Sequence, residues 1–462
     1  MFPAEVYIER RRRLVEQINS GLILFMGNNE SPMNYPDNIY PFRQDGSFLY
    51  YFGLDDPSLA AVIDVDDGSV CLFGDDLTVD DIVWTGPLPT VSDRARVVGI
   101  DRTAPLGQLH DLQHAATVAG RAVRFLPQYR GDNVLAIQRM LEICPSEIAS
   151  RTSETLTRAV VAQRSIKSPE EIAEIEASVN LTGAMHVLAM SMTRPGLYER
   201  EVAGAMEGLV LSAGGRLAFP TIFSIHGETL HNHYHGNQMS AGDIVVSDAG
   251  AQTASGYAGD ITRTIPVGGR FSARQRDIYT IVLDAQEAAI AACRSGVEFR
   301  DVHRLASTML VSGLKELGLV KGDPDDAVSA GVHTLFFQCG LGHMMGLDVH
   351  DMEGLGEQYV GYTDQIRRNP EFGWKSLRLA KALEPGFVIT VEPGIYFIPE
   401  LMDRWRADNK CSDFINYDAV ETYRDFGGVR VEDDILITES GHRLLGDPIP
   451  KTIDEVQAIA SS

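Results

Sequence analysis

The sequence predicts an α+β protein of two domains, a small α/β domain followed by a larger domain of helices and antiparallel strands. Three observations support this. The chain has 462 residues, whereas single hydrophobic cores stop growing at roughly 250 to 300 residues. A strong helix-start signal follows residue 160, and beyond it long helical patterns alternate with strand-like segments. We therefore expect domains at 1–160 and 161–462.

Short apolar runs with turn signals fill the first 160 residues and predict strands. The runs are "GLILFMG" (21–27), "SLAAVIDVDDGSVCLFG" (58–74) and "ARVVGI" (95–100). Asp67 and Gly68 lie between two alternating β-rich stretches, and an Asp-Gly pair suits a tight reversing turn. The second run is therefore expected to form a hairpin, and the mixture of strands with helical stretches predicts a small α/β domain.

A long helix is expected to open the second domain. Ser168 suits the N-cap, Pro169 the first helical position, and Glu171 completes a capping box, so the helix should run to about Met192. Further helices are predicted at about 198–213, 272–294 and 299–317. The strand-like segments "DIVVSD", "FVITVEPGIYF" and "VEDDILIT" lie between and after them, which favours an α+β arrangement over a doubly wound one.

The composition excludes several classes of function. Lys and Arg total 40 against 64 Asp and Glu, a net charge of −24, and such a polyanion is repelled by nucleic-acid phosphates and anionic lipids. Five scattered cysteines without a C-x-x-C pair suggest neither a disulfide framework nor a zinc knuckle. No uncharged apolar run reaches the roughly 18 residues of a membrane span. We expect no nucleic-acid or membrane partner and a cytoplasmic location.

Four segments place acidic or imidazole groups inside apolar strand patterns, where burial is costly unless the groups share a partner. Taken singly, the acidic or histidine residue of each segment has an ordinary interpretation as a helix cap, a turn residue or a core residue. They are "IVVSDAG…GYAGDITRT" (244–264), "GLGHMMGLDVHD" (340–351), "VITVEPGIY" (388–396) and "GGVRVEDDILI" (427–437). Their joint occurrence indicates one shared site.

The chemistry of these segments favours a metal centre. Asp248, Asp260, Glu392 and Glu432 are flanked by Val, Ile and Gly, and four buried anions would repel one another unless cations lay between them. Oxygen donors with an imidazole suit Mn²⁺, Co²⁺ or Zn²⁺ better than a thiolate-preferring metal. Two ions roughly 3.5 Å apart would activate one shared water, which is hydrolase chemistry.

These segments resemble the four signatures of the pita-bread metallopeptidases, in the branch of aminopeptidase P and prolidase. The stretch 40–68, "YPFRQDGSFLYYFGLDDPSLAAVIDVDDG", is similar to the first domain of the same enzymes. The resemblance implies a pita-bread catalytic domain behind an aminopeptidase P-like N-terminal domain. It also implies two divalent metal ions, most often Mn²⁺ with Co²⁺ or Zn²⁺ as alternatives, and a homodimer.

The resemblance assigns the metal ligands residue by residue. Asp248 corresponds to a terminal ligand of one metal, and Asp260 and Glu432 to bridging ligands. His343 and Glu392 would complete the second metal, with Glu392 also relaying a proton from the attacking water to the leaving nitrogen.

Further residues correspond to catalytic and substrate-binding positions. His350 matches a histidine that touches the substrate, and Arg430 an arginine that orients Glu432 and the substrate. The stretch "LHNHYHGNQM" offers three histidines for an oxyanion-stabilising donor. Its spacing before "GD" favours His231, the following tyrosine favours His233, and His235 is the third candidate. We prefer His231 as the catalytic donor and retain His233 as a substrate-binding residue.

Members of this branch cleave the bond before proline, and the sequence bears on which substrate is used. Prolidase takes Xaa-Pro dipeptides and clamps the free proline carboxylate, whereas aminopeptidase P removes the first residue of longer peptides. The stretch "KSLRLAKALEPG" (375–386) resembles a prolidase segment and makes Arg378 the candidate clamp. The long segment 398–428 is also similar to prolidase, so an Xaa-Pro dipeptidase is expected, with an aminopeptidase P as the alternative.

Two hypotheses from other classes compete with a peptidase. A creatinase-like amidinohydrolase and a non-catalytic binding module would share the fold but are expected to lack the metal ligands. The spacing of Asp248 and Asp260 also needs explanation, because twelve residues is one more than the family usually has. The flanking motifs are intact, so we expect the extra residue in a hairpin turn at "AQTAS" (251–255), where it leaves both strands in register.

Overall fold

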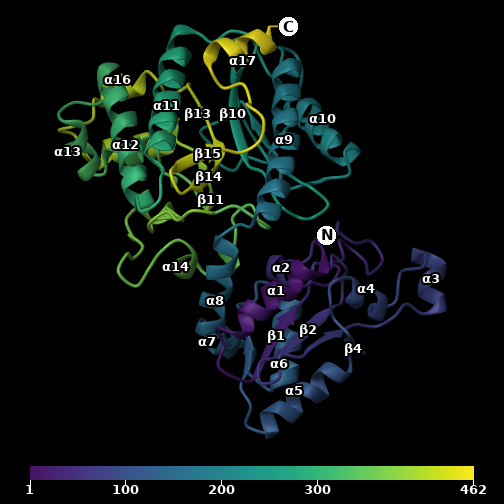
Figure 1. Ribbon diagram of the computed structural model, residues 1–462. Coiled ribbons are helices and arrows are strands. Elements are labelled where there is room, and N and C mark those ends of the chain that lie inside the picture. Colours follow the sequence, from purple (N-terminus) through teal and green to yellow (C-terminus); the bar gives the residue numbers. More distant parts are fainter. Residues whose placement is uncertain (462) are drawn as a thin grey trace. The chain divides into compact units, whose positions relative to one another are not determined.

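The computed structural model describes residues 1–461 and divides them into two compact units (Figure 1). The first comprises Met1–Arg164 together with Met352–Tyr359, and the second comprises Ser165–Asp351 together with the described residues from Val360 onward. None of the helices in the described part of the chain combines the length and the apolar character that crossing a membrane requires.

The first unit is built on a five-stranded mixed sheet in the order β4-β3-β2-β1-β5. β1, β2 and β3 pair antiparallel, whereas β5 and β4 run parallel to β1 and β3. The expected hairpin is confirmed, because β2 and β3 flank Gly68, whose φ of 73° is the left-handed conformation that this turn requires. The strands are β1 (Leu22–Met26), β2 (Ala60–Asp64), β3 (Val70–Phe73), β4 (Arg102–Ala104) and β5 (Val123–Phe125).

Helices complete the first unit. A buried cluster between sheet and helices contains Leu22, Leu24, Val62, Phe73 and Phe125 from the strands and Leu109, Ile137 and Ile148 from the helices. The helices are α1 (Ala4–Val15), α2 (Gly46–Phe52), α3 (Val79–Thr85), α4 (Val91–Val97), α5 (Gln108–Val118), α6 (Gly131–Leu141), α7 (Ile148–Arg151) and α8 (Glu154–Ser165). This sheet with its helices is the small α/β domain that the sequence predicts.

One expected strand of this unit was wrong. The run 95–100 forms the end of α4 and the turn after it. Val91, Ala95 and Val98 are the buried positions, a spacing of four and three that is helical, and Thr90 caps the helix by accepting from the backbone N–H of Asp93. The strand interpretation failed because the helix begins before the apolar run.

Long helices open and surround the second unit. The capping box predicted at Ser168 and Glu171 is present, and α9 runs from Pro169 to Met192 as expected. In Figure 1, β10 and β13 run between α9 on one side and α11 on the other. The helices are α9 (Pro169–Met192), α10 (Glu199–Ser212), α11 (Ala273–Ala292), α12 (Phe299–Glu316), α13 (Pro324–Ser329), α15 (Pro399–Ala407), α16 (Tyr417–Glu421) and α17 (Ile453–Ala460), with the short α14 (Glu357–Val360) at the unit boundary.

Small antiparallel sheets form the interior of the second unit. Their orders are β10-β8-β7, β11-β14-β15, β12-β13 and β6-β9. The strands are β6 (Arg216–Leu217), β7 (Ile222–Ser224), β8 (Ile244–Ala249), β9 (Ala251–Gln252), β10 (Ile261–Pro266), β11 (Val388–Val391), β12 (Gly394–Tyr396), β13 (Gly428–Arg430), β14 (Asp433–Thr438) and β15 (Gly441–Leu444). Helices outside small antiparallel sheets confirm the α+β class.

The register of β8 and β10 places both spaced aspartates on one face. Asp248 lies opposite Thr262, and Asp260 precedes Thr262 by two residues, so all three side chains point to the same side of the pleat. The turn between the two aspartates lies at Thr253–Gly256, narrower than the expected 251–255, because Ala251–Gln252 already forms β9. A spacing of twelve therefore preserves the site.

This turn is fastened to α9. The Ser178 hydroxyl donates to the carbonyl oxygen of Tyr257 at 2.6 Å and accepts from the backbone N–H of Thr253 at 3.2 Å. The Glu174 carboxylate accepts from the hydroxyls of Thr253 and Ser255. Because these bonds fix the turn at several points, the longer connection does not loosen the two strands it joins.

Arg263 provides a test of what holds the second unit together. Its side chain is fully buried and bonds Asp433 at 2.7 Å and the carbonyl oxygens of Glu432 and Pro450. Removing one partner of a buried ion pair leaves an uncompensated charge, so Arg263→Met should lower the free energy of unfolding by about 3 kcal/mol or more. Urea unfolding followed by tryptophan fluorescence measures this, and the exposed Arg276→Met should change it by less than about 0.5 kcal/mol. Equal stability of the two variants would contradict the assignment.

Candidate metal centre and active site

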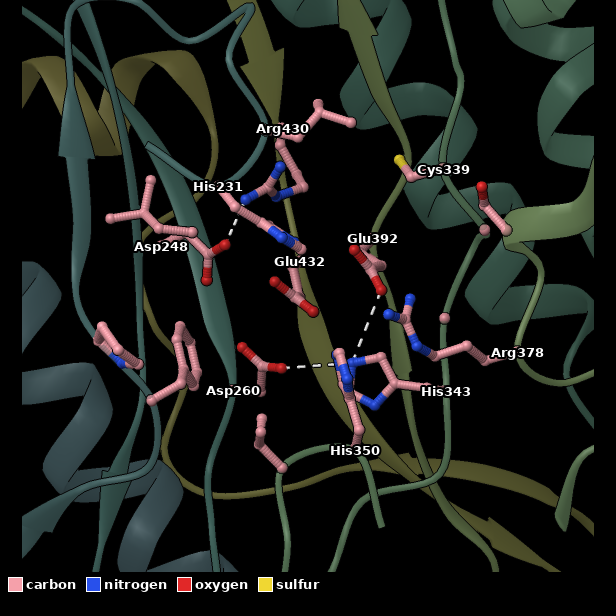
Figure 2. A pocket seen from close by; sticks show the side chains of 18 of the residues that line it. His231, Asp248, Asp260, Cys339, His343, His350, Arg378, Glu392, Arg430 and Glu432 are labelled. Carbon is pink, nitrogen blue, oxygen red and sulfur yellow. Dashed lines mark hydrogen bonds and ion pairs between the residues drawn. The ribbon is translucent and has the colours of Figure 1, made fainter. Parts of the chain in front are cut away.

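One pocket in the second unit collects every site residue predicted from the sequence, and Figure 2 labels all of them except His233. The residues come from strands and connecting segments that lie far apart along the chain. Asp248 is on β8, Asp260 directly precedes β10, Glu392 directly follows β11, and Glu432 lies between β13 and β14. The pocket is lined by His231, His233, Asp248, Asp260, His343, His350, Arg378, Glu392, Arg430 and Glu432, with apolar residues that include Phe219, Pro220, Ile222, Leu230 and Val349.

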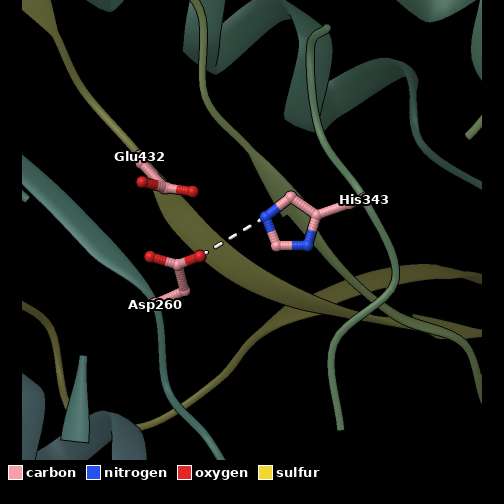
Figure 3. A group of neighbouring side chains, drawn as sticks. All are labelled: Asp260, His343 and Glu432. Atoms are coloured by element: carbon pink, nitrogen blue, oxygen red, sulfur yellow. Dashed lines mark ion pairs between the residues drawn. The ribbon is translucent and has the colours of Figure 1, made fainter. Parts of the chain in front are cut away.

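The tightest group of potential ligands is Asp260, His343 and Glu432 (Figure 3). One donor atom from each lies within 4.8 Å of the others, and all three side chains are buried. The Nε2 atom of His343 is 3.3 Å from Oδ2 of Asp260 and 3.7 Å from Oε1 of Glu392. These donor atoms therefore face a common centre from three separate elements.

Three acidic residues of the pocket, Asp260, Glu392 and Glu432, have pKa values shifted toward the neutral form. Burial raises the pKa values of Asp260 and Glu432 well above their usual range, and the neighbouring carboxylates add to both shifts. Burial also raises the pKa of Glu392, although His343 and Arg430 oppose that shift. A cation bound among these groups would reverse the direction of the shifts, because it favours the ionised form.

Arg430 is the positively charged residue beside these carboxylates, and it contacts several of the surrounding side chains. It is buried and forms an ion pair with Asp248, and its Nε donates to the Thr262 hydroxyl at 3.0 Å. Thr262 in turn donates to Oε2 of Glu432 at 2.6 Å, and the Arg430 Nη1 donates to the Tyr396 hydroxyl at 3.0 Å. The guanidinium thereby fixes one carboxylate directly and a second through a hydroxyl.

The backbone orients the imidazole of His343 toward the carboxylates. Its Nδ1 is 3.0 Å from the carbonyl oxygen of Met344, which favours a proton on Nδ1 and leaves Nε2 as the lone-pair donor. The segment is held against β11, because the N–H of Thr390 donates to the His343 carbonyl oxygen. The ring of His350 lies edge-on to His343 at 4.3 Å between centroids.

The structure separates the three histidines of the loop 231–235. His231 and His233 line the pocket, whereas the Nε2 of His235 contacts the carbonyl oxygen of Thr221 at 3.1 Å. Burial lowers the pKa of His231, and the charge of Arg430 lowers it further, which favours a neutral ring that donates from one nitrogen. His235 thus has a structural partner outside the pocket.

Several residues of the site were missed from the sequence. Thr262 and Tyr396 are the polar partners of Arg430, and the Asp434 carboxylate accepts from the backbone N–H of Asp260 at 2.9 Å. Cys339 lines the pocket, and burial raises its pKa to about 12. Thr262 follows the predicted ligand Asp260 by two residues, and Asp434 follows Glu432 by two. Because side chains two apart on a strand point to the same face, this spacing could have indicated Thr262 from the sequence.

Comparisons with known proteins identify the family. A sequence profile of metallopeptidase family M24 matches residues 173–439, and one of the aminopeptidase P N-terminal domain matches residues 7–123. The chain belongs to metallopeptidase family M24. The resemblance to its prolidase and aminopeptidase P branch is confirmed, as are the enzyme interpretation and the two-part α+β architecture.

Relatives and solved structures agree on the branch. Human Xaa-Pro dipeptidase is 30% identical over 473 residues, covering 99% of this chain and 93% of that protein. Escherichia coli Xaa-Pro aminopeptidase is 32% identical over 469 residues, covering 97% of this chain and 96% of that protein. A zinc-substituted E. coli aminopeptidase P in complex with product has a TM-score of 0.81 at 29% identity, covering 99% of this chain and 98% of that one.

The residues present suit a divalent cation. Within the described part of the chain, the Oδ1 atoms of Asp248 and Asp260 are buried and accept no hydrogen bond, although buried carboxylate oxygens are normally satisfied. Oxygen donors with one imidazole are the ligands that Mn²⁺ and Zn²⁺ accept. The family membership and this donor set support a divalent metal in the pocket.

The raised pKa values predict how metal binding depends on pH. Carboxyl groups with raised pKa values retain protons above about pH 4.5, and a metal must displace those protons to bind. The affinity for Mn²⁺ should therefore rise, and proton release fall, between about pH 5.5 and about pH 7.5. Calorimetric titration in two buffers of different ionisation enthalpy measures both. In Glu432→Gln the proton release at low pH should be smaller, and an affinity that falls with pH would contradict the assignment.

Proposed function

We propose that the protein is a dinuclear metal-dependent Xaa-Pro dipeptidase. The observation that carries the proposal is the position of Arg378, which enters the pocket beside Glu392 and His343 (Figure 2). A guanidinium at that place suits the free carboxylate of a C-terminal proline, which it can hold through two parallel hydrogen bonds. The relatives include both a dipeptidase and an aminopeptidase that act on Xaa-Pro bonds, so the clamp decides the preference.

The proposed metal ligands are the five residues expected from the family. Asp248 would hold one ion, His343 and Glu392 would hold the other, and Asp260 and Glu432 would be shared by both. When bound, such ions polarise the scissile carbonyl and lower the pKa of water, which supplies the nucleophile. The unbonded oxygens of Asp248 and Asp260 and the cluster around His343 support this arrangement.

The surrounding side chains provide the remaining chemistry in this proposal. Glu392 takes the proton of the attacking water and delivers it to the proline nitrogen, from its position in the pocket beside His343. His231 and His350 donate to the oxyanion and to the substrate from the pocket wall. Arg430 orients Asp248 and Glu432 through the contacts described above, and His233 contacts the substrate at the edge of the pocket.

The wider setting is also part of the proposal. Residues 1–160 act as the N-terminal domain and residues 161–462 as the catalytic domain. We propose Mn²⁺ as the ion used in cells, with Co²⁺ and Zn²⁺ able to replace it, and a homodimer in the cytoplasm. The net charge of −24 supports a role with neither nucleic acids nor anionic membranes as partners.

Removal and return of the metal test the catalytic proposal. After dialysis against a chelator, hydrolysis of Ala-Pro and Gly-Pro should be lost, and added Mn²⁺ should restore it. Asp260→Ala, which removes a bridging ligand, should lower kcat by about a thousandfold or more even with excess Mn²⁺. Continued hydrolysis of Xaa-Pro peptides by metal-free enzyme would contradict the mechanism, and an absence of activity toward every Xaa-Pro peptide would contradict the function.

A comparison of dipeptides with longer peptides tests the clamp. Arg378→Ala should lower kcat/KM for Ala-Pro by about tenfold to a hundredfold, because a charge-assisted pair of hydrogen bonds is lost. The matched control is Arg404→Ala, an exposed arginine on α15, which should have little effect. If Ala-Pro-Ala is cleaved far faster than Ala-Pro and Arg378→Ala is silent, the enzyme is an aminopeptidase P.

A further inference from the structure

The segment 361–378, which ends at Arg378, is fastened to the catalytic unit at its base. The Tyr362 hydroxyl donates to the carbonyl oxygen of Leu377 at 2.5 Å. Gly361 packs so closely on Arg378 that a Cβ at Gly361 would lie 1.8 Å from the Arg378 carbonyl oxygen. The backbone of Arg378 is therefore fixed where the segment closes on itself.

Trp374, four residues before Arg378, anchors the same segment from the other side. Its ring meets His303 of α12 edge-on at 5.2 Å between centroids, and meets His333 of the short 3-10 helix Val332–Leu335 edge-on at 4.9 Å. Gly373 adopts a φ of 84°, and a Cβ there would lie 2.3 Å from Cγ2 of Thr334. We name His303 and His333 the histidine socket of Trp374.

The histidine socket is uncharged and built for packing. Both rings are 1% exposed, and burial lowers the pKa of His303 to about 3 and that of His333 to about 4. Within the described residues the ring nitrogens of His303 make no hydrogen bond, so this ring contributes contact area with Phe337, His333 and Trp374. Neutral rings arranged edge-to-face hold an indole in one orientation.

The segment has the charge that an anionic substrate group requires. Arg367, Arg368 and Lys375 are exposed along it, against Asp364 and Glu371, in a chain whose net charge is −24. A local excess of cations attracts carboxylates over a distance of about 10 Å at ordinary salt. The segment thus combines a cationic outer surface with one arginine directed into the pocket.

We propose that Trp374, seated in the histidine socket, is a positioning residue for Arg378 and so determines the preference for substrates with a free proline carboxylate. The inference rests on the proposed function of Arg378. It assigns a role to three residues that do not line the pocket: His303, His333 and Trp374. Loss of the indole frees the segment before Arg378 and lets the guanidinium leave its position, while the metal ligands keep theirs.

The experiment compares Ala-Pro with its C-terminal amide on the full-length enzyme loaded with Mn²⁺. Trp374→Ala should raise KM for Ala-Pro and lower the ratio of kcat/KM for the acid to that for the amide by about tenfold. Hydrolysis of the amide and the affinity for Mn²⁺ should stay within about twofold. Trp374→Phe, which keeps a ring in the socket, should recover most of the ratio, and the inhibition constant for free proline should follow the same order.

Two further variants make each outcome decisive. Phe372→Ala alters an exposed ring of the same segment and should leave the ratio unchanged. His303→Leu removes one wall of the socket and answers the question if Trp374→Ala does not fold. An equal loss for acid and amide would reduce Trp374 to a structural role and overturn the inference. If Arg378→Ala lowers the ratio and neither Trp374→Ala nor His303→Leu does, the inference about Trp374 is wrong and the proposed role of Arg378 stands. If Arg378→Ala also leaves the ratio unchanged, the clamp itself fails.

Discussion

Repulsion among buried carboxylates is the constraint on which the catalytic unit is built. Asp248, Asp260, Glu392 and Glu432 converge on one pocket, and burial alone favours the neutral forms of Asp260, Glu392 and Glu432. The fold compensates in two ways that act together. Arg430 supplies a fixed positive charge at one side of the group, and the remaining donor atoms face a common centre that a divalent cation suits. Neither compensation works unless the strands hold the oxygens within a few ångströms.

The metal centre therefore depends on the register of the strands that carry its ligands. A slip of one residue between β8 and β10 would turn Asp248 or Asp260 away from the pocket. Hydrogen bonds from α9 fix the turn between them, and Arg263 ties β10 to the backbone of Glu432 and to Asp433. The long helices outside thus act on the metal centre through the strands, which explains why a large unit surrounds so small a site.

The sequence predicted those parts of the site and fold that follow from local pattern. The sequence motifs were sufficient to predict which of the charged and imidazole residues line the pocket, and the capping box at Ser168 predicted the start of α9. The histidine socket could not be predicted, because His303, His333 and Trp374 are brought together only by tertiary packing. The helix over Val91–Val97 was missed because it begins four residues before the apolar run 95–100 that suggested a strand.

The proposed catalytic chemistry and the proposed selectivity occupy different kinds of structure in this enzyme. The carboxylates and His343 lie on or beside strands that are bonded on several sides, where small displacements are costly. Arg378 instead lies at the end of a segment with little regular structure, held at its base by Tyr362 and Leu377 and, four residues before Arg378, by Trp374. Loops on a rigid scaffold tolerate change without loss of the fold. With Arg378 in its proposed role, a shift between dipeptidase and aminopeptidase preference would require a change only in this segment and its socket, while the metal centre and its register stay the same.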